Sequence, residues 1–268
     1  MRKISVLLAA ALAAAMLFAG CSQASSNSAA AGGDLLKVGV RKNLSNFSVY
    51  NEDADTCYGF EADLALELST VLGYGGVQYV SLDPEEREDA VSGGEVDCLI
   101  AAFSYTADRA EKFDLSQPYY YDSGRVMIEK STLFSDYADL AGSKVAVRSG
   151  TDAAENITAK LIEEGLIASA DEVSSFLEIV EYDSYEAMNT ALEYGDVDAL
   201  CADGCITLPW MNSERAYFAS PYSEEEYVIA TIKGSPLTDK IASALSELSD
   251  NGTIADLEVK WGINNEEE

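Results

Sequence analysis

The chain alternates short apolar runs with stretches in which apolar residues recur at helical spacing. Runs such as 37–41 and 144–148 have the length and content of buried strands. The leucine spacing over 60–72 predicts an amphipathic helix that ends at the following glycines. Further helices are predicted over 84–92, 152–164, 185–194 and 237–250. Strands that alternate with helices predict an α/β fold with βαβ units and mainly parallel sheets.

Two phrases of the sequence occur twice. Residues 37–41 (KVGVR) recur as 144–148 (KVAVR), and residues 94–102 (GEVDCLIAA) recur as 195–203 (GDVDALCAD). Chance recurrence of short strand phrases is one explanation. The other is two similar lobes whose strands end at a common cleft, and ligands of parallel sheets bind outside the carboxyl ends of the strands.

The stretch 98–109 has the pattern of a ligand site. Cys98 to Ala102 is predicted as a buried strand, and Ser104 and Thr106 are residue types that cap helices. Arg109 then falls in the first helical turn, where a cation opposes the helix dipole unless an anion lies between them. The stretch therefore predicts a carboxylate or phosphate receptor, with a capped surface helix and a solvated arginine as the alternative.

The N-terminus has the pattern of an export signal. Residues 1–20 combine two basic residues with an apolar run too short to span a bilayer. The residues before Cys21 resemble the lipobox of bacterial lipoproteins, which implies a lipid on Cys21; an ordinary cleaved signal is the alternative. Residues 21–34 are predicted to be a flexible tether. We expect the folded part to lie outside the cell membrane, anchored through this lipid.

Charge and composition narrow the function. The formal net charge of −30 argues against nucleic acid or an anionic membrane surface as a partner. The sequence has no histidine, which excludes histidine-based acid–base catalysis and ordinary zinc sites. Cys98 and Cys201 lie in apolar runs and are expected as buried free thiols. A Cys201–Cys205 disulfide stays open, as does the state of Cys57.

These features resemble one protein family over residues 35–262. The phrases that carry the resemblance are 36–40 (LKVGV), 58–64 (YGFEADL), 94–97 (GEVD), 106–111 (TADRAE), 114–120 (DLSQPYY), 149–151 (SGT) and 195–199 (GDVDA). The chain is similar to the solute-binding proteins of polar amino acid ABC importers, family 3, with the type II periplasmic-binding-protein fold.

The resemblance implies an organisation and a mode of action. It implies a discontinuous first lobe (35–124 and 227–268), a second lobe (125–226), and crossings near 122–124 and 223–227. A polar amino acid would bind in the cleft, the lobes would close by a hinge, and the closed form would dock on an ABC permease. The resemblance implies a monomer with no cofactor.

The resemblance also implies roles for individual residues. Arg109 would bind the ligand α-carboxylate and Asp203 the α-ammonium, the latter with capping of the next helix as its alternative. The remaining candidates are the Ser104 hydroxyl, the Ala102 carbonyl, the loop residues Gly150, Thr151 and Asp152, and Phe47, for which core packing is the alternative.

Two other arginines are candidates for binding the side chain of the ligand. Arg41 and Arg148 end the two repeated strands, and an arginine at the place of Arg41 binds the side-chain carboxylate in some relatives. This favours glutamate or aspartate. Two points oppose it: the negative net charge repels anions, although salt screens this beyond about 10 Å, and both arginines can instead pair with surface acids.

Three other classes of function are considered. One is an enzyme on the same fold, similar to cyclohexadienyl dehydratase, in which Asp152 or Glu61 would act as the acid or base. The second is a sensor ectodomain, which would need a following transmembrane segment. The third is a lipoprotein that only mediates contacts and has no closing cleft.

Overall fold

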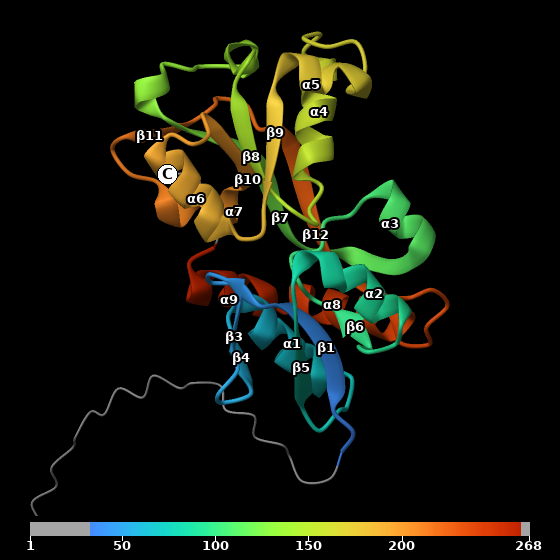
Figure 1. The fold of residues 1–268 in the computed structure, drawn as a ribbon. Helices are drawn as coiled ribbons and strands as arrows, with labels where there is room; N and C mark the ends of the chain where they lie inside the picture. The colour runs from blue at the N-terminus through green and yellow to red at the C-terminus, as the bar shows by residue number, and fades with distance from the viewer. Residues whose placement is uncertain (1–32, 264–268) are drawn as a thin grey trace, which may run out of the picture.

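The computed structural model describes residues 33–263, which form two lobes joined by a narrow waist (Figure 1). The predicted signal 1–20 and the predicted lipidated Cys21 lie outside the described residues, as does most of the tether 21–34. Within residues 33–263, no helix has the length and apolar content needed to cross a membrane.

The first lobe, lower in Figure 1, combines N-terminal elements with two C-terminal helices. Its elements are β1 (Leu36–Arg41), β2 (Asn43–Leu44), β3 (Ser48–Asn51), β4 (Thr56–Tyr58), α1 (Phe60–Val71), β5 (Val77–Leu82), η1 (Pro84–Glu86), α2 (Arg87–Ser92), β6 (Cys98–Leu99), α3 (Ala107–Lys112), α8 (Thr238–Asp250) and α9 (Thr253–Trp261).

The second lobe comes from the middle of the chain. Its elements are η2 (Lys130–Thr132), η3 (Tyr137–Leu140), β8 (Lys144–Arg148), α4 (Ala153–Glu163), η4 (Ala170–Glu172), α5 (Val173–Phe176), β9 (Glu178–Tyr182), α6 (Tyr185–Tyr194), β10 (Ala199–Asp203), α7 (Gly204–Thr207), η5 (Leu208–Trp210) and β11 (Arg215–Tyr217).

Two long strands run through both lobes: β7 (Phe113–Glu129) and β12 (Ser223–Ile232). They pair antiparallel, with Asp122 opposite Glu225 and Tyr120 opposite Tyr227. The main sheet has the order β5-β1-β6-β12-β7-β10-β8-β9, with β11 on β7, so the paired strands join two parallel halves. This confirms the predicted two-lobed α/β fold.

The two repeated phrases occupy equivalent places in the two halves. Strands β1 and β6 are parallel neighbours, as are β8 and β10. Asp97 Oδ2 accepts from the amide of Lys37 at 2.9 Å, and Asp198 Oδ2 accepts from the amide of Lys144 at 2.8 Å. The same backbone-to-carboxylate contact in each lobe shows that the repetition is structural.

The predicted helices are present with ends that agree to within one residue, and the first turn of 84–92 is the 3-10 helix η1. The predicted strand 98–102 is wrong in length, because β6 contains only Cys98 and Leu99. The backbone then turns away from the sheet, with Ala102 at a positive φ of 44°. Side chains rather than a neighbouring strand bind the backbone polar groups of Ala101 and Ala102.

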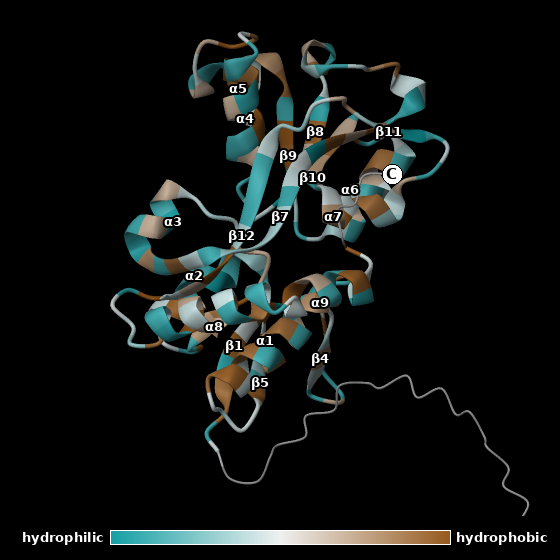
Figure 2. Cartoon of the chain, turned by 180° about the vertical axis from the view of Figure 1, so that it is seen from behind, coloured by the Kyte–Doolittle hydropathy of each residue, from teal (hydrophilic) through white to brown (hydrophobic). Residues whose placement is uncertain are grey.

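Apolar side chains pack on both faces of the sheet, and one cluster is continuous from lobe to lobe. Helices α1 and α4 carry both apolar and polar residues in Figure 2, as amphipathic helices do. At the waist, Phe47 packs edge-on against Phe60, Tyr120 and Tyr227. Cys57, Cys98, Cys201 and Cys205 are all free thiols, so Cys201 and Cys205 are not bridged.

Candidate functional site

A small charged cavity lies where the two lobes meet. Seven of its lining residues were predicted from the sequence: Arg41, Ala102, Ser104, Arg109, Thr151, Asp152 and Asp203. Five were not: Arg87, Ala153, Tyr185, Cys201 and Ala202. The space left between these residues is about 10 Å³, room for about one water. A ligand larger than a water molecule therefore enters only if the residues that line the cavity move apart.

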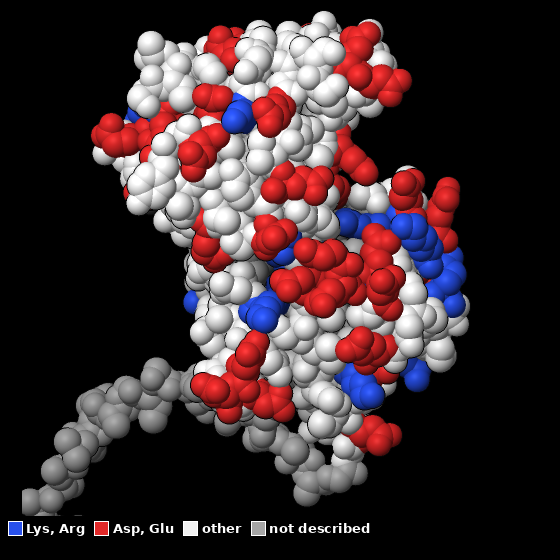
Figure 3. Space-filling model, viewed as in Figure 1, with Lys and Arg blue, Asp and Glu red and all other residues white. Residues whose placement is uncertain are grey.

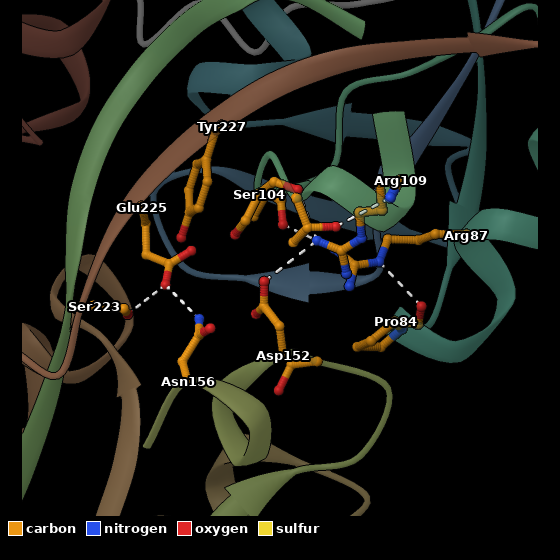
Figure 4. Close-up of polar contacts among 12 residues, drawn as sticks. Pro84, Arg87, Ser104, Arg109, Asp152, Asn156, Ser223, Glu225 and Tyr227 are labelled. Carbon is orange, nitrogen blue, oxygen red and sulfur yellow. Dashed lines mark hydrogen bonds and ion pairs between the residues drawn. The ribbon is translucent and has the colours of Figure 1, made fainter. Parts of the chain in front are cut away.

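Arg109 projects from the first turn of α3 into this cavity (Figure 4). Thr106 caps the helix, as predicted, by accepting a hydrogen bond from the Arg109 amide at 3.1 Å. The guanidinium stacks on the Phe103 ring at 4.1 Å and donates to the Ser104 carbonyl at 2.8 Å. Its carboxylate contacts are long, 3.5 Å to Asp152 and 3.5 Å to Glu88. A buried, oriented guanidinium whose carboxylate neighbours are distant is suited to bind a further carboxylate at short range.

Asp203 lies at the end of β10 on the opposite wall. It occupies the N-cap position of α7, yet its side chain does not cap that helix. The carboxyl group instead accepts a hydrogen bond from the Tyr227 hydroxyl. Burial, followed by the nearby Glu225 and Asp122 carboxylates, raises the pKa of Asp203 well above its usual value. A cation placed beside Asp203 would relieve this repulsion.

Arg87, which the sequence interpretation missed, shapes the floor of the cavity. Its guanidinium donates to the Pro84, Ala101 and Ala102 carbonyls at 2.8–3.0 Å. Burial, together with Arg41 and Arg109, lowers the pKa of Arg87 to about 9. Three guanidiniums close enough to affect one another mark a positive region in a strongly acidic protein.

Ala102 is held from its other side by Glu61. The Glu61 carboxylate accepts from the Ala102 amide at 2.6 Å and from the Tyr119 hydroxyl at 2.6 Å. Glu61 is fully buried and does not line the cavity. It therefore fixes the turn after β6, and with it the wall that carries Ser104.

Arg41 and Arg148 end equivalent strands but have different surroundings. The Arg41 guanidinium is buried and lies 5.5 Å from the centre of the Tyr185 ring. Among residues 33–263 no acidic side chain forms an ion pair with Arg41. Arg148 does not line the cavity and pairs across the cleft with Glu85 at 3.2 Å and Asp83 at 3.7 Å.

Gly150 lies near Arg148, where the second lobe contacts Glu85 of the first lobe, and it does not line the cavity. Its carbonyl accepts from Arg87 Nη2 at 3.2 Å. Its φ is +72°, and a Cβ atom at this position would lie 2.7 Å from the backbone nitrogen of Glu85 in the other lobe. The lobes can approach this closely only because residue 150 has no side chain.

Gly150→Ala is therefore expected to hold the lobes apart. The variant should bind ligand at least about tenfold more weakly, because closure would cost steric overlap and an unfavourable φ. Titration calorimetry measures the affinity, and solution scattering measures compaction on ligand addition. Gly142→Ala is the matched control, since Gly142 also has a positive φ but no atom near its Cβ position. Ligand-induced compaction equal to that of the control would contradict the expectation.

Phe47 has no exposed surface and does not line the cavity. The structure thus shows the core packing that the sequence left as its alternative. Arg87 is detectable in hindsight from the pattern that marked Arg109, an arginine in the first turn after a capped helix start. The order of the neighbouring strands brings Tyr185, Cys201 and Ala202 to the cavity, and nothing in their local sequence indicates it.

The fold and the site define a class: two-lobed proteins that enclose a small ligand between the lobes. The model of the family described as bacterial extracellular solute-binding proteins, family 3, matches residues 36–264, and the chain belongs to this family.

The chain is 26% identical to the ABC transporter glutamine-binding protein GlnH of Bacillus subtilis, over 97% of each chain. It superposes on an ancestral arginine-binding protein bound to arginine, with a TM-score of 0.71, 26% identity and coverage of 85% and 97%. It also superposes on the GluR0 ligand-binding core of Nostoc punctiforme in complex with L-glutamate, with a TM-score of 0.70, 25% identity and coverage of 85% and 99%.

Proposed function

We propose that the protein binds a polar amino acid between its lobes and delivers it to an ABC permease. One observation carries the proposal: the buried guanidinium of Arg109 and the partly buried carboxyl of Asp203 face one cavity, from different lobes. A zwitterion removed from water needs an opposite charge at each end, and this cavity offers both. The similarity to amino-acid-binding relatives supports the same assignment.

Closure is the working step of the proposed cycle. The proposed lobes are 35–124 with 227–268, and 125–226, with the hinge at 122–124 and 223–227. The ligand carboxylate replaces the 3.5 Å contact between Arg109 and Asp152 with two short hydrogen bonds. Thr151 and the first turn of α4 then lie beside the same carboxylate. A ligand that has both charges stabilises the closed form, and one that lacks either charge gains little from closure.

Glutamate or aspartate is the proposed preference. Arg41 is a buried guanidinium without a carboxylate partner among the described residues, so an anionic ligand side chain would supply one. Acidic side chains form patches on both lobes on the face shown in Figure 3. Salt screens their repulsion beyond about 10 Å, whereas Arg41, Arg87 and Arg109 act on a ligand at contact distance.

The proposed location is the outer face of the cell membrane. The lipid at Cys21 anchors the protein at the outer face of the cell membrane, in keeping with a family of extracellular proteins. The protein acts as a monomer, with the membrane-embedded permease as its partner. No nucleic acid takes part.

A thermal-shift panel of the twenty amino acids plus cystine tests the function. Glutamate or aspartate should stabilise the protein most, because binding to the folded state raises stability in proportion to the logarithm of ligand excess. Stabilisation by arginine or lysine alone would overturn the acidic preference. No response to any member of the panel would overturn the proposed function.

Arg41→Gln tests the side-chain assignment separately. The variant should bind glutamate at least about tenfold more weakly while its affinity for glutamine changes by less than about threefold, because only the side-chain carboxylate loses its partner. Calorimetry with both ligands measures the two effects. Lys42→Gln is the control, since Lys42 pairs with Glu52 on the surface. Equal losses for glutamate and glutamine would place Arg41 outside side-chain recognition.

A further inference from the structure

Glu225 is a buried carboxyl group that ligand binding, as described so far, does not use. It lies on β12 where this strand pairs with β7, opposite Asp122. Only 3% of its surface is exposed, whereas its neighbours Glu224 and Glu226 are exposed. Burial at this point of the strand indicates a specific set of partners.

Those partners come from three places in the fold. Ser223 donates to Glu225 Oε1 at 2.5 Å from the start of the same strand. Asn156 donates to the same oxygen at 3.1 Å from α4 of the second lobe. Ser104, on the cavity wall of the first lobe, is the third partner, and its hydroxyl acts to lower the pKa of Glu225, which burial raises. Figure 4 shows Glu225 between Ser223 and Asn156, with Ser104 and Asp152 on the cavity side.

The Ser104 segment and Asn156 both connect Glu225 to the ligand site. The segment that carries Ser104 is fixed to β12, since the Tyr105 amide donates to the Glu226 carbonyl at 2.8 Å and the Val228 amide to the Phe103 carbonyl at 2.9 Å. Asn156 lies one helical turn after Asp152, which contacts Arg109. Glu225 thus connects the wall that carries Ser104 to the helix whose first turn forms the opposite wall.

We propose that Glu225 is the positioning residue of closure: through Asn156 it holds α4 against the Ser104 wall, so that the two sides of the ligand carboxylate site stay aligned. This inference rests on the proposed function and names the residue that makes the closed form persist. The carboxyl touches no part of the cavity itself. Its effect is therefore on how long the ligand stays bound, not on how it is recognised.

The test uses the full folded protein and the amino acid that stabilises it most in the panel. Glu225→Ala and Asn156→Ala should each raise the dissociation rate about tenfold and leave the association rate within about threefold, because they remove the hydrogen bond that holds α4 to β12 at the crossing between the lobes. Glu225→Gln keeps an acceptor oxygen and should stay within about threefold of the unmodified protein. Stopped-flow fluorescence measures both rates.

The double variant and the controls decide between positioning and general damage. Glu225→Ala with Asn156→Ala should lose no more than the more affected single variant, because both remove the same contact. Glu224→Ala and Glu226→Ala, on the same strand but exposed, should behave as the unmodified protein. Asn156→Ala keeps the proposal testable if Glu225→Ala folds poorly, since alanine is favourable inside a helix.

Two results would overturn the inference: dissociation rates of both single variants within twofold of the unmodified protein, or losses that add in the double variant. Failure of the proposed function looks different. In that case no member of the panel binds, and solution scattering of the ligand-free Asn156→Ala variant still reports whether the contact keeps the lobes together. If the scattering of the ligand-free variant equals that of the ligand-free unmodified protein, the positioning role is contradicted as well.

Discussion

Replacing Arg109 with alanine is expected to abolish amino acid binding while the ligand-free fold remains intact. Arg109 is 8% exposed, and its guanidinium is oriented by the Phe103 ring and the Ser104 carbonyl. Removing one partner of a buried ion pair typically costs about 3–5 kcal/mol, which corresponds to a loss of at least about 100-fold in affinity. The fold should tolerate the change, because α3 is a short helix at the edge of the first lobe.

Calorimetry on the purified variant measures this loss, and its melting temperature without ligand checks the fold. Arg109→Lys keeps the charge but not the two-pronged geometry, so it should recover only part of the affinity. Lys112→Ala on the same helix is the matched control, since Lys112 pairs with Glu88 outside the cavity. Affinity in Arg109→Ala equal to that of the unmodified protein would remove the proposed site.

Asp203→Asn is expected to weaken binding about 100-fold and to stabilise the ligand-free protein at neutral pH. The amide keeps the shape of the carboxyl group but cannot pair with an ammonium. The gain in stability follows from relief of burial and of repulsion from Glu225 and Asp122, which raise the pKa of Asp203. Opposite signs for binding and stability separate a ligand-binding carboxyl from a structural one.

The pH dependence has a defined sign. A pKa raised by folding means that the folded state binds more protons than the unfolded state above the ordinary carboxyl pKa. Stability is therefore fully present below that pKa and falls as the pH rises through the raised value. Binding has the reverse dependence, because a ligand ammonium favours the ionised carboxylate and releases a proton.

Melting temperatures and affinities between pH 4 and pH 8 measure both trends. Asp203→Asn should flatten each curve. Asp198→Asn is the control, since that carboxylate binds the Lys144 amide at the far end of the same lobe. An unchanged affinity in Asp203→Asn, or a stability curve that keeps the shape of the unmodified protein, would contradict the assignment.

The sequence predicted individual elements well because their signals are local. Helix caps such as Thr106, the glycines after helices and the four-residue spacing of leucines each act within a turn or two of the chain. The duplication was also visible in the sequence, because each lobe uses a similar strand and turn sequence for strands at equivalent places in its half of the sheet. Strand 98–102 was overestimated, since no local signal shows that Arg87 and Glu61 bind the backbone there.

The site residues were predicted in part from the repeated strand ends and the helix cap at Thr106, and in part from the family resemblance. Seven of the predicted residues line the cavity: Arg41, Ala102, Ser104, Arg109, Thr151, Asp152 and Asp203. Phe47 and Arg148 do not, because an aromatic or an arginine near a strand end has several low-energy destinations. Phe47 packs against Tyr120 at the waist, and Arg148 forms an ion pair with Glu85 across the cleft.

By itself the sequence determined the α/β class, the two lobes and the charged ends of their strands, because periodicity and repetition are written along the chain. The tertiary structure alone decided which charges meet. Arg87 beneath Ala102, Tyr185 beside Arg41 and Glu225 against Asn156 are far apart in sequence. Their contacts depend on how two lobes close on each other, and that geometry follows from the pairing of β7 with β12 rather than from any local pattern.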